Sequence, residues 1–300
     1  MTLISFSKIK RSTVNSMKNS ISEALELIHF SFEREIKNVV IKPNLCYYWD
    51  YSTGQTTDPR FVAALVTLIR EKTSHDTCVS VVESDASAMK CKQVFRMLGY
   101  ERLSQEYDFN LVNLSEETYD PVKETVLGKD FHLSVPRIIR NADLRINLPK
   151  IKYMLEKVKI TCALKNVFGC NPYPKKFRYH PYLEEVIVAA NKAMRFELCL
   201  VDGNIVSGAQ PRKLGLAMAG KDLVAIDTAA ARILGVNPYR IRHIRLAQKE
   251  GLGNMSFNEV GVPMSYFEER YPRRGIRAKL VSQAYRIVKS TGLGPKLGLE

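Results

Sequence analysis

Short apolar strands alternate along this chain with amphipathic helices of ten or more residues. The run KNVVIK (37–42) is typical of a buried strand, and PRFVAALVTLIRE (59–71) is typical of a helix that Asp58 can cap. The same order recurs with TCVSVVE (77–83) and a helix over 87–98. Because parallel strands need long crossover connections, this alternation predicts an open, mostly parallel α/β sheet with helices on both faces.

The rest of the chain continues the pattern and suggests its division. We predict further strands over 109–113, 142–148 and 198–201, and further helices over 20–35, 161–168, 181–196, 222–234 and 238–250. Two irregular stretches, about 120–135 with hairpin character and 149–180, are expected to form a smaller cap or subdomain. We therefore expect one α/β domain over 1–254 and an appendage over 255–300 that contains a basic amphipathic helix near 276–289.

Positive charge is concentrated in two parts of the 300-residue chain, whose net charge is +14. Residues 149–178 hold eight Lys/Arg and one Glu, and residues 271–300 hold seven Lys/Arg and one Glu. Such local fields attract phosphates, carboxylates, nucleic acid or an anionic membrane surface. An anionic small molecule is therefore an expected partner, and RNA or a membrane surface could bind residues 271–300.

Several classes of protein are excluded or disfavoured. No apolar stretch approaches the length of a transmembrane helix, and the first thirty residues lack the core of a secretory signal, so we expect a cytoplasmic chain. None of the six cysteines is spaced as C-x-x-C, which argues against a zinc ribbon or a four-cysteine iron–sulfur cluster. No glycine-rich nucleotide motif follows a strand, which disfavours NAD-type and P-loop binding.

Polar side chains gather where the predicted strands end. In open α/β sheets, ligands bind beyond the carboxyl ends of the strands. The residues found there are Lys42, Asn44, Glu83, Lys150, Lys152 and Asp202. A pocket with several lysines suits a phosphorylated or carboxylated metabolite, and Glu83 or Asp202 could act as a general base or hold a divalent metal.

The segment ITCALKNVFG (160–169) adds further candidates. Thr161 could cap a short helix, and Lys165 and Asn166 lie between apolar neighbours, so at least one of them is expected to be partly buried. A partly buried lysine must find an anion or lower its pKa, which makes Lys165 a candidate catalytic residue. His180, at a predicted helix start, is a further candidate. Asp227 either faces the pocket or anchors a loop amide.

An ordered set of motifs resembles the uncharacterised family known as domain of unknown function 362. The set comprises VVIKPN (39–44), TTDP (56–59), Glu83-Ser84, LPKIK (148–152), ITCALKNVFG (160–169), His180, VDG (201–203), Gly208 with Pro211, KDLVAIDTAAARILG (221–235) and GLG (251–253). The resemblance implies an α/β fold and leaves the function open. It also implies a ferredoxin-like redox partner, because some relatives carry a fused iron–sulfur module, which this chain lacks.

One position departs from the family pattern. Met154 stands where the pattern has a histidine, and a thioether cannot serve as an acid, a base or a hard-metal ligand. A mechanism that needs this histidine would require His180 to replace it.

Three functions are consistent with these features. The first is an enzyme or enzyme-like binder of an anionic small molecule, in which lysines hold the anion and Asn44 and Asn166 orient it. The second is binding of structured RNA by the basic central block, where aromatic residues lie among the cations, and by the tail. The third is a redox or metal-centre accessory, which requires Cys46, Cys162 or Cys170 to meet His180.

Overall fold

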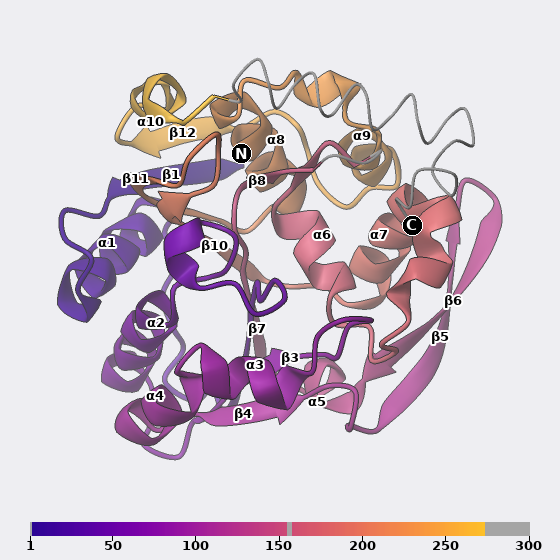
Figure 1. Cartoon of the computed structure of the whole chain (residues 1–300), viewed down its shortest axis with the longest axis horizontal. Coiled ribbons are helices and arrows are strands. Elements are labelled where there is room, and N and C mark those ends of the chain that lie inside the picture. Colours follow the sequence, from indigo (N-terminus) through magenta and orange to yellow (C-terminus); the bar gives the residue numbers. More distant parts are fainter. Residues whose placement is uncertain (1, 155–157, 274–300) are drawn as a thin grey trace.

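The computed structural model describes residues 2–154 and 158–273, and in them one large sheet runs through the centre of the molecule (Figure 1). Seven of its strands run in one direction and β11 runs against them, so the predicted mostly parallel α/β fold is confirmed. In sheet order the strands are β12 (Asn258–Gly261), β1 (Leu3–Lys8), β11 (Arg212–Gly220), β10 (Leu198–Val206), β7 (Leu144–Leu148), β2 (Asn38–Pro43), β3 (Cys78–Glu83) and β4 (Asn110–Asn113).

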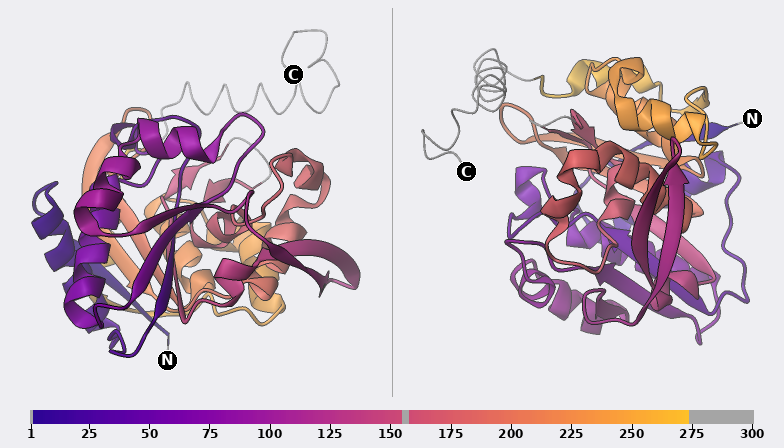
Figure 2. Two further views of the ribbon diagram at one scale, coloured as in Figure 1. Left: turned by 90° about the horizontal axis from the view of Figure 1, so that it is seen from below. Right: turned by 90° about the vertical axis from the view of Figure 1, so that its right-hand side faces the viewer.

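Helices cover both faces of the sheet, as Figures 1 and 2 show. One layer contains α1 (Val14–Leu27), α2 (Pro59–Lys72), α3 (Cys91–Met97) and α4 (Tyr100–Tyr107). The other contains α6 (Ala163–Phe168), α7 (Leu183–Ala193), α8 (Leu223–Ile233), α9 (Arg242–Lys249) and α10 (Met264–Arg270). Successive strand residues face opposite layers: Val39 and Ile41 of β2 join the first core and Val40 joins the second.

Smaller elements lie around this three-layer body. The hairpin expected near 120–135 is present as β5 (Tyr119–Val126) and β6 (Lys129–Pro136), which pack against α7. Within 149–180 the chain forms the two-residue strands β8 (Lys152–Tyr153) and β9 (Ile160–Thr161), then α6 and η2 (Lys176–Tyr182). The remaining short helices are α5 (Arg137–Arg140), η1 (Tyr51–Thr53) and η3 (Pro238–Arg240).

Three strands of the main sheet were not predicted from the sequence. These are β1, β11 and β12, and β11 contains the run LGLAMAG, whose glycines and alanines carry a weak strand signal. Residues 258–261, assigned above to the appendage, form β12 and pair in parallel with β1. The basic amphipathic helix predicted near 276–289 lies outside the described residues.

The first predicted helix, over 20–35, is shifted. The observed helix α1 spans Val14–Leu27. It begins at Val14 because the Thr13 side chain caps the first turn by accepting a hydrogen bond from the Ser16 amide. The cap, which the apolar spacing alone did not reveal, sets where this helix begins.

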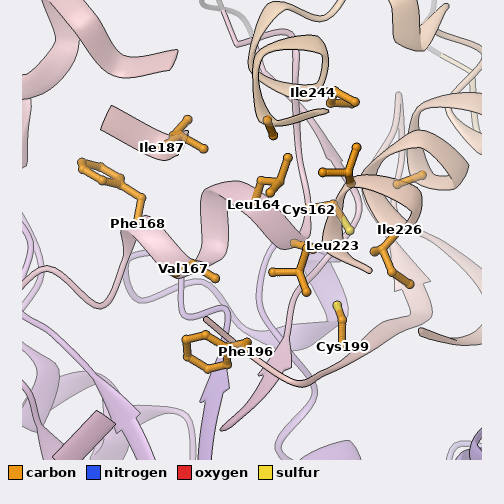
Figure 3. Close-up of a cluster of buried hydrophobic side chains, with 14 of the residues drawn as sticks. Cys162, Leu164, Val167, Phe168, Ile187, Phe196, Cys199, Leu223, Ile226 and Ile244 are labelled. Atoms are coloured by element: carbon orange, nitrogen blue, oxygen red, sulfur yellow. The ribbon is translucent and has the colours of Figure 1, made fainter. Parts of the chain in front are cut away.

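The short helix α6 is fixed by an apolar core and by one buried carboxylate. Figure 3 shows its side chains Leu164, Val167 and Phe168 among buried residues of α7 and α8. At its start, the Asp227 carboxylate of α8 accepts hydrogen bonds from the amides of Ala163 (2.6 Å) and Leu164 (3.3 Å). Asp227 is fully buried and therefore serves as an anchor for α6 rather than as a pocket group.

We expect Asp227→Ala to lower the free energy of unfolding by about 3 kcal/mol, since two buried amides lose their acceptor. Urea denaturation followed by circular dichroism measures this change. Asp76→Ala, at an exposed position between α2 and β3, is the matched control and should change stability by less than about 0.5 kcal/mol. Equal effects of the two substitutions would contradict the anchoring role.

Candidate functional site

The side chains predicted to share one edge of the sheet do meet there. Lys42 is the last residue but one of β2, Glu83 ends β3, and Lys150 and Lys152 follow β7. Asp202 lies within β10, which continues to Val206, and its amide donates to the carbonyl oxygen of Pro149 after β7 (3.1 Å). The carboxyl ends of neighbouring parallel strands thus bring together residues that are up to 160 positions apart in the chain.

Lys42 and Glu83 form a buried ion pair between β2 and β3. The Lys42 ammonium lies 2.8 Å from the Glu83 carboxylate and also donates to the carbonyl oxygen of Pro43 (2.7 Å). The carboxylate accepts two further hydrogen bonds, from the amides of Ser84 (2.9 Å) and Leu45 (3.3 Å). Both charges are therefore compensated inside the protein.

Lys150 and Asp202 form a second buried ion pair between β7 and β10. Their charged atoms are 3.1 Å apart, and Lys150 also donates to the Ile205 carbonyl oxygen (2.7 Å). Asp202 accepts from the amides of Asn204 (3.0 Å) and Asp58 (2.8 Å). Burial, together with the nearby Asp202 charge, raises the pKa of Asp58, although the Arg60 guanidinium opposes this.

Three asparagines link the strand ends to α6. The side-chain amide of Asn44 donates to the side-chain oxygen of Asn166 (3.2 Å). The side-chain amide of Asn166 donates to the side-chain oxygen of Asn147 (2.8 Å) and to the backbone carbonyl oxygen of Lys42 (3.0 Å). Asn147 in turn donates to the Ala163 carbonyl oxygen (2.9 Å). This chain of amides fixes the orientation of Asn44, which is partly exposed at the surface end of the network.

Lys152 differs from the other two lysines at this edge. It is buried and donates to neutral oxygens, Oδ1 of Asn44 (2.6 Å) and the Gln55 carbonyl (2.9 Å). None of the ion pairs within residues 2–154 and 158–273 involves it. Burial lowers the pKa of Lys152 to about 8, and the charges of Lys165 and Lys150 act in the same direction.

Two hydroxyl groups beside Lys152 are buried without a hydrogen-bond partner among the described residues. Thr56 follows Gln55, one acceptor of the ammonium, and Thr161 pairs with Lys152 across β8 and β9. The predicted role of Thr161 as the cap of α6 is not what the structure shows, because Cys162 occupies the cap position and Asp227 receives the amides. Unsatisfied buried hydroxyls are uncommon, so these two retain hydrogen-bonding capacity that the described residues do not use.

Sequence reasoning missed one lysine, Lys176 in η2. Its ammonium donates to the Ser84 hydroxyl (2.7 Å) and the Asp85 carbonyl oxygen (2.6 Å), next to the Lys42–Glu83 pair. Burial lowers the pKa of Lys176 to about 8. The only sequence signal was its place in the basic block 149–178, because the loop that folds it back onto β3 follows no periodic pattern.

The remaining candidates occupy different positions. Lys165 is half-buried on α6, and its charge acts on Lys152. His180 is exposed in η2, and Met154 is half-buried after β8. Within the described part of the chain, no three His, Cys, Asp or Glu side chains are grouped as a metal ion requires. Burial raises the pKa of Cys170 to about 12, and it raises that of Cys162 as well.

None of the helices in the described ranges is both long and apolar enough to cross a bilayer.

The fold defines an α/β protein with buried lysines, carboxylates and asparagines gathered at the carboxyl edge of its sheet. The chain belongs to the family described as Domain of unknown function (DUF362), whose family model matches residues 39–232.

The chain is also similar to two individual proteins. It is 27% identical over 253 residues, 80% of this chain and 75% of the relative, to the thylakoid-associated protein sll1697 of Synechocystis sp.. The lactate racemase apoprotein of Thermoanaerobacterium thermosaccharolyticum overlaps 78% of this chain with a TM-score of 0.48 and 16% identity, and the chain spans 57% of that protein's length.

The buried pair Lys42–Glu83 yields a stability prediction. Lys42→Met leaves Glu83 as an unpaired buried carboxylate, and we expect it to cost about 3 to 5 kcal/mol of unfolding free energy. The double variant Lys42→Met/Glu83→Gln removes both charges and should recover a large part of that loss. Chemical denaturation of the wild type, both single variants and the double variant measures this coupling; strictly additive losses would show that the pair is not coupled.

The lowered pKa of Lys152 yields a pH prediction. Between about pH 8 and 10.5 the unfolded chain retains a proton that folded Lys152 has lost, so folding becomes more favourable as pH rises. The stability of the wild type relative to Lys152→Met should be constant below about pH 8 and then increase by up to about 1.4 kcal/mol per pH unit. Urea midpoints at pH 7 to 10 measure it, and a flat difference would contradict the buried, lowered-pKa state.

Proposed function

We propose that this protein is an enzyme-like binder of an anionic, phosphorylated or carboxylated small molecule at the carboxyl edge of its sheet. The observation that carries the proposal is Lys152, a buried lysine whose hydrogen bonds go to neutral oxygens. Its charge is costly to bury and would be stabilised by a bound anion. The two unsatisfied hydroxyls beside it, on Thr56 and Thr161, are suitable donors to the same anion.

The lysines of the edge divide into two groups in this proposal. Lys42 and Lys150 are neutralised by Glu83 and Asp202 and hold the strand ends together. The anion is then held by Lys152, whose acceptors are neutral oxygens, together with Lys176 and Lys165. Asn44, partly exposed and fixed by Asn166, orients it.

The same division affects proton transfer. Glu83 and Asp202 already accept several hydrogen bonds each, which supports a structural role more than that of a general base. Lys152 and Lys176 each have a pKa of about 8, which suits proton exchange near neutral pH, and Lys152 is the one that also donates to Asn44, the side chain that orients the anion in this proposal. We therefore assign proton transfer, if the bound molecule reacts, to Lys152.

The alternative of RNA binding by the central basic block has weaker support. Of the aromatics there, Phe168 is buried and the Tyr153 hydroxyl is engaged with the Leu234 carbonyl oxygen. The Arg178 guanidinium lies over the rings of Tyr173 and Tyr179, 4.4 and 4.8 Å from their centroids. Phe177 is exposed, but stacking of successive bases of a single strand requires several free rings, so this block supports RNA binding less well than anion binding.

The test uses two anions whose charge is constant from pH 6 to 10, sulfate and acetate, titrated by calorimetry. We expect binding that weakens above about pH 8, by up to tenfold per pH unit, as Lys152 loses its proton. Lys152→Gln and Lys165→Ala should each weaken binding by about tenfold or more. Preference for sulfate or acetate would distinguish a phosphate-type from a carboxylate ligand.

The matched control is Lys249→Gln, an exposed lysine at the end of α9, which should bind as the wild type does. Binding that is equally weakened by Lys249→Gln would indicate a general effect of net charge. Full retention of affinity in Lys152→Gln at pH 7 would show that the anion site is elsewhere.

A further inference from the structure

The loop that Lys152 holds carries two exposed aromatic rings. The loop follows β2 and spans residues 44–55. The Lys152 ammonium donates hydrogen bonds to its first residue, Asn44, and to its last, Gln55. A second link, from the Thr57 amide to the Asn44 carbonyl oxygen (2.9 Å), closes the loop at its base. The geometry of the loop is therefore coupled to the group that we propose to contact the anion.

The rings belong to Tyr47 and Trp49. Each is 48% exposed, and their centroids are 5.9 Å apart. The backbone of Tyr47 has a positive φ of 52°, a conformation that is unfavourable for a tyrosine and is retained only where the surroundings impose it. Between these residues Tyr48 turns the other way, and its hydroxyl accepts from the Lys90 amide (3.0 Å) and donates to the Gln93 side chain (3.1 Å).

Further contacts fix the C-terminal half of the loop. Gly54 approaches the backbone of Val206 and Ser207 so closely that an added Cβ would lie 2.3 Å from the Val206 carbonyl carbon. The Arg60 guanidinium covers the ring of Tyr51, 4.6 Å from its centroid. Tyr47 and Trp49 are thus the aromatic side chains left exposed on a loop that is held at both ends.

We propose that the anion bound at this edge carries a planar aromatic or heteroaromatic ring, which stacks on Tyr47 and Trp49 while its phosphate or carboxylate group reaches Lys152. This inference rests on the proposed anion site and names the class of its ligand. Asn44, which accepts from the Lys152 ammonium, lies three residues before Tyr47, so the two rings begin on the same short loop as the acceptor of the charge. Aromatic side chains stack on planar rings regardless of the substituents that those rings carry, whereas the lysine selects a negatively charged ligand.

Two pairs of probes differ only in the ring. Adenosine 5′-monophosphate is compared with ribose 5-phosphate, and benzoate with cyclohexanecarboxylate, by calorimetry on the full chain at pH 7. We expect the aromatic member of at least one pair to bind about tenfold more tightly. Trp49 is the only tryptophan of the chain, so its fluorescence should change with the aromatic probe of that pair and less with its partner.

Variants separate the ring contact from the anion contact. Tyr47→Ala/Trp49→Ala should remove the preference for the aromatic probe and leave the affinity for the non-aromatic partner within about twofold, and Tyr47→Phe should retain the preference. Tyr239→Ala, an exposed tyrosine in η3, is the control and should have no effect.

Each contrary outcome has a distinct meaning. Equal affinity for both members of both pairs, with anion binding intact, overturns the stacking inference and leaves the proposed function standing. No binding of any of the four probes, together with no binding of sulfate or acetate, overturns both. A single-stranded oligonucleotide that binds far more tightly than the mononucleotide, with a strong salt dependence, overturns the small-molecule inference in favour of nucleic acid.

Discussion

Two buried ion pairs hold together the edge of the sheet on which the rest of the site depends. Lys42–Glu83 joins β2 to β3, and Lys150–Asp202 joins the end of β7 to β10. A buried charge without a partner is strongly unfavourable, so each pair requires its two strands to keep their register. Their remaining hydrogen-bonding capacity fixes the backbone around them, since Glu83 binds the amide of Leu45 and Asp202 that of Asp58 at the start of α2.

With these charges neutralised, the surplus positive charge is carried by neighbouring side chains. Lys152 and Lys176 donate to neutral oxygens, and their lowered pKa values have burial of the ammonium group as the main cause. Lys152 in addition holds both ends of the loop that presents Tyr47 and Trp49. Lys152 therefore connects the proposed anion site, to which it supplies the charge, with the proposed ring contact, whose loop it holds.

Much of the fold followed from local sequence patterns. The strands at 37–42 and 77–83 and the helix that begins at Pro59 were predictable because apolar periodicity and caps are local. β11 was missed because its glycines and alanines form a strand only through pairing with β1 and β10. Among the site residues, Lys42, Glu83 and Asp202 were found by the rule that ligand groups follow parallel strands, whereas Lys176 lies on an irregular segment to which no such rule applies.

The sequence by itself determined which residue types reach the carboxyl edge of the sheet, because the apolar runs and the helices between them reveal where each parallel strand ends. Only the tertiary structure decided what each of them does there. Four lysines that look alike in the sequence became two neutralised by carboxylates, one held by neutral oxygens and one half-buried on α6. The reason is physical: the state of a buried ammonium depends on which acceptors lie within about 3 Å of it, and these come from segments far apart in the chain.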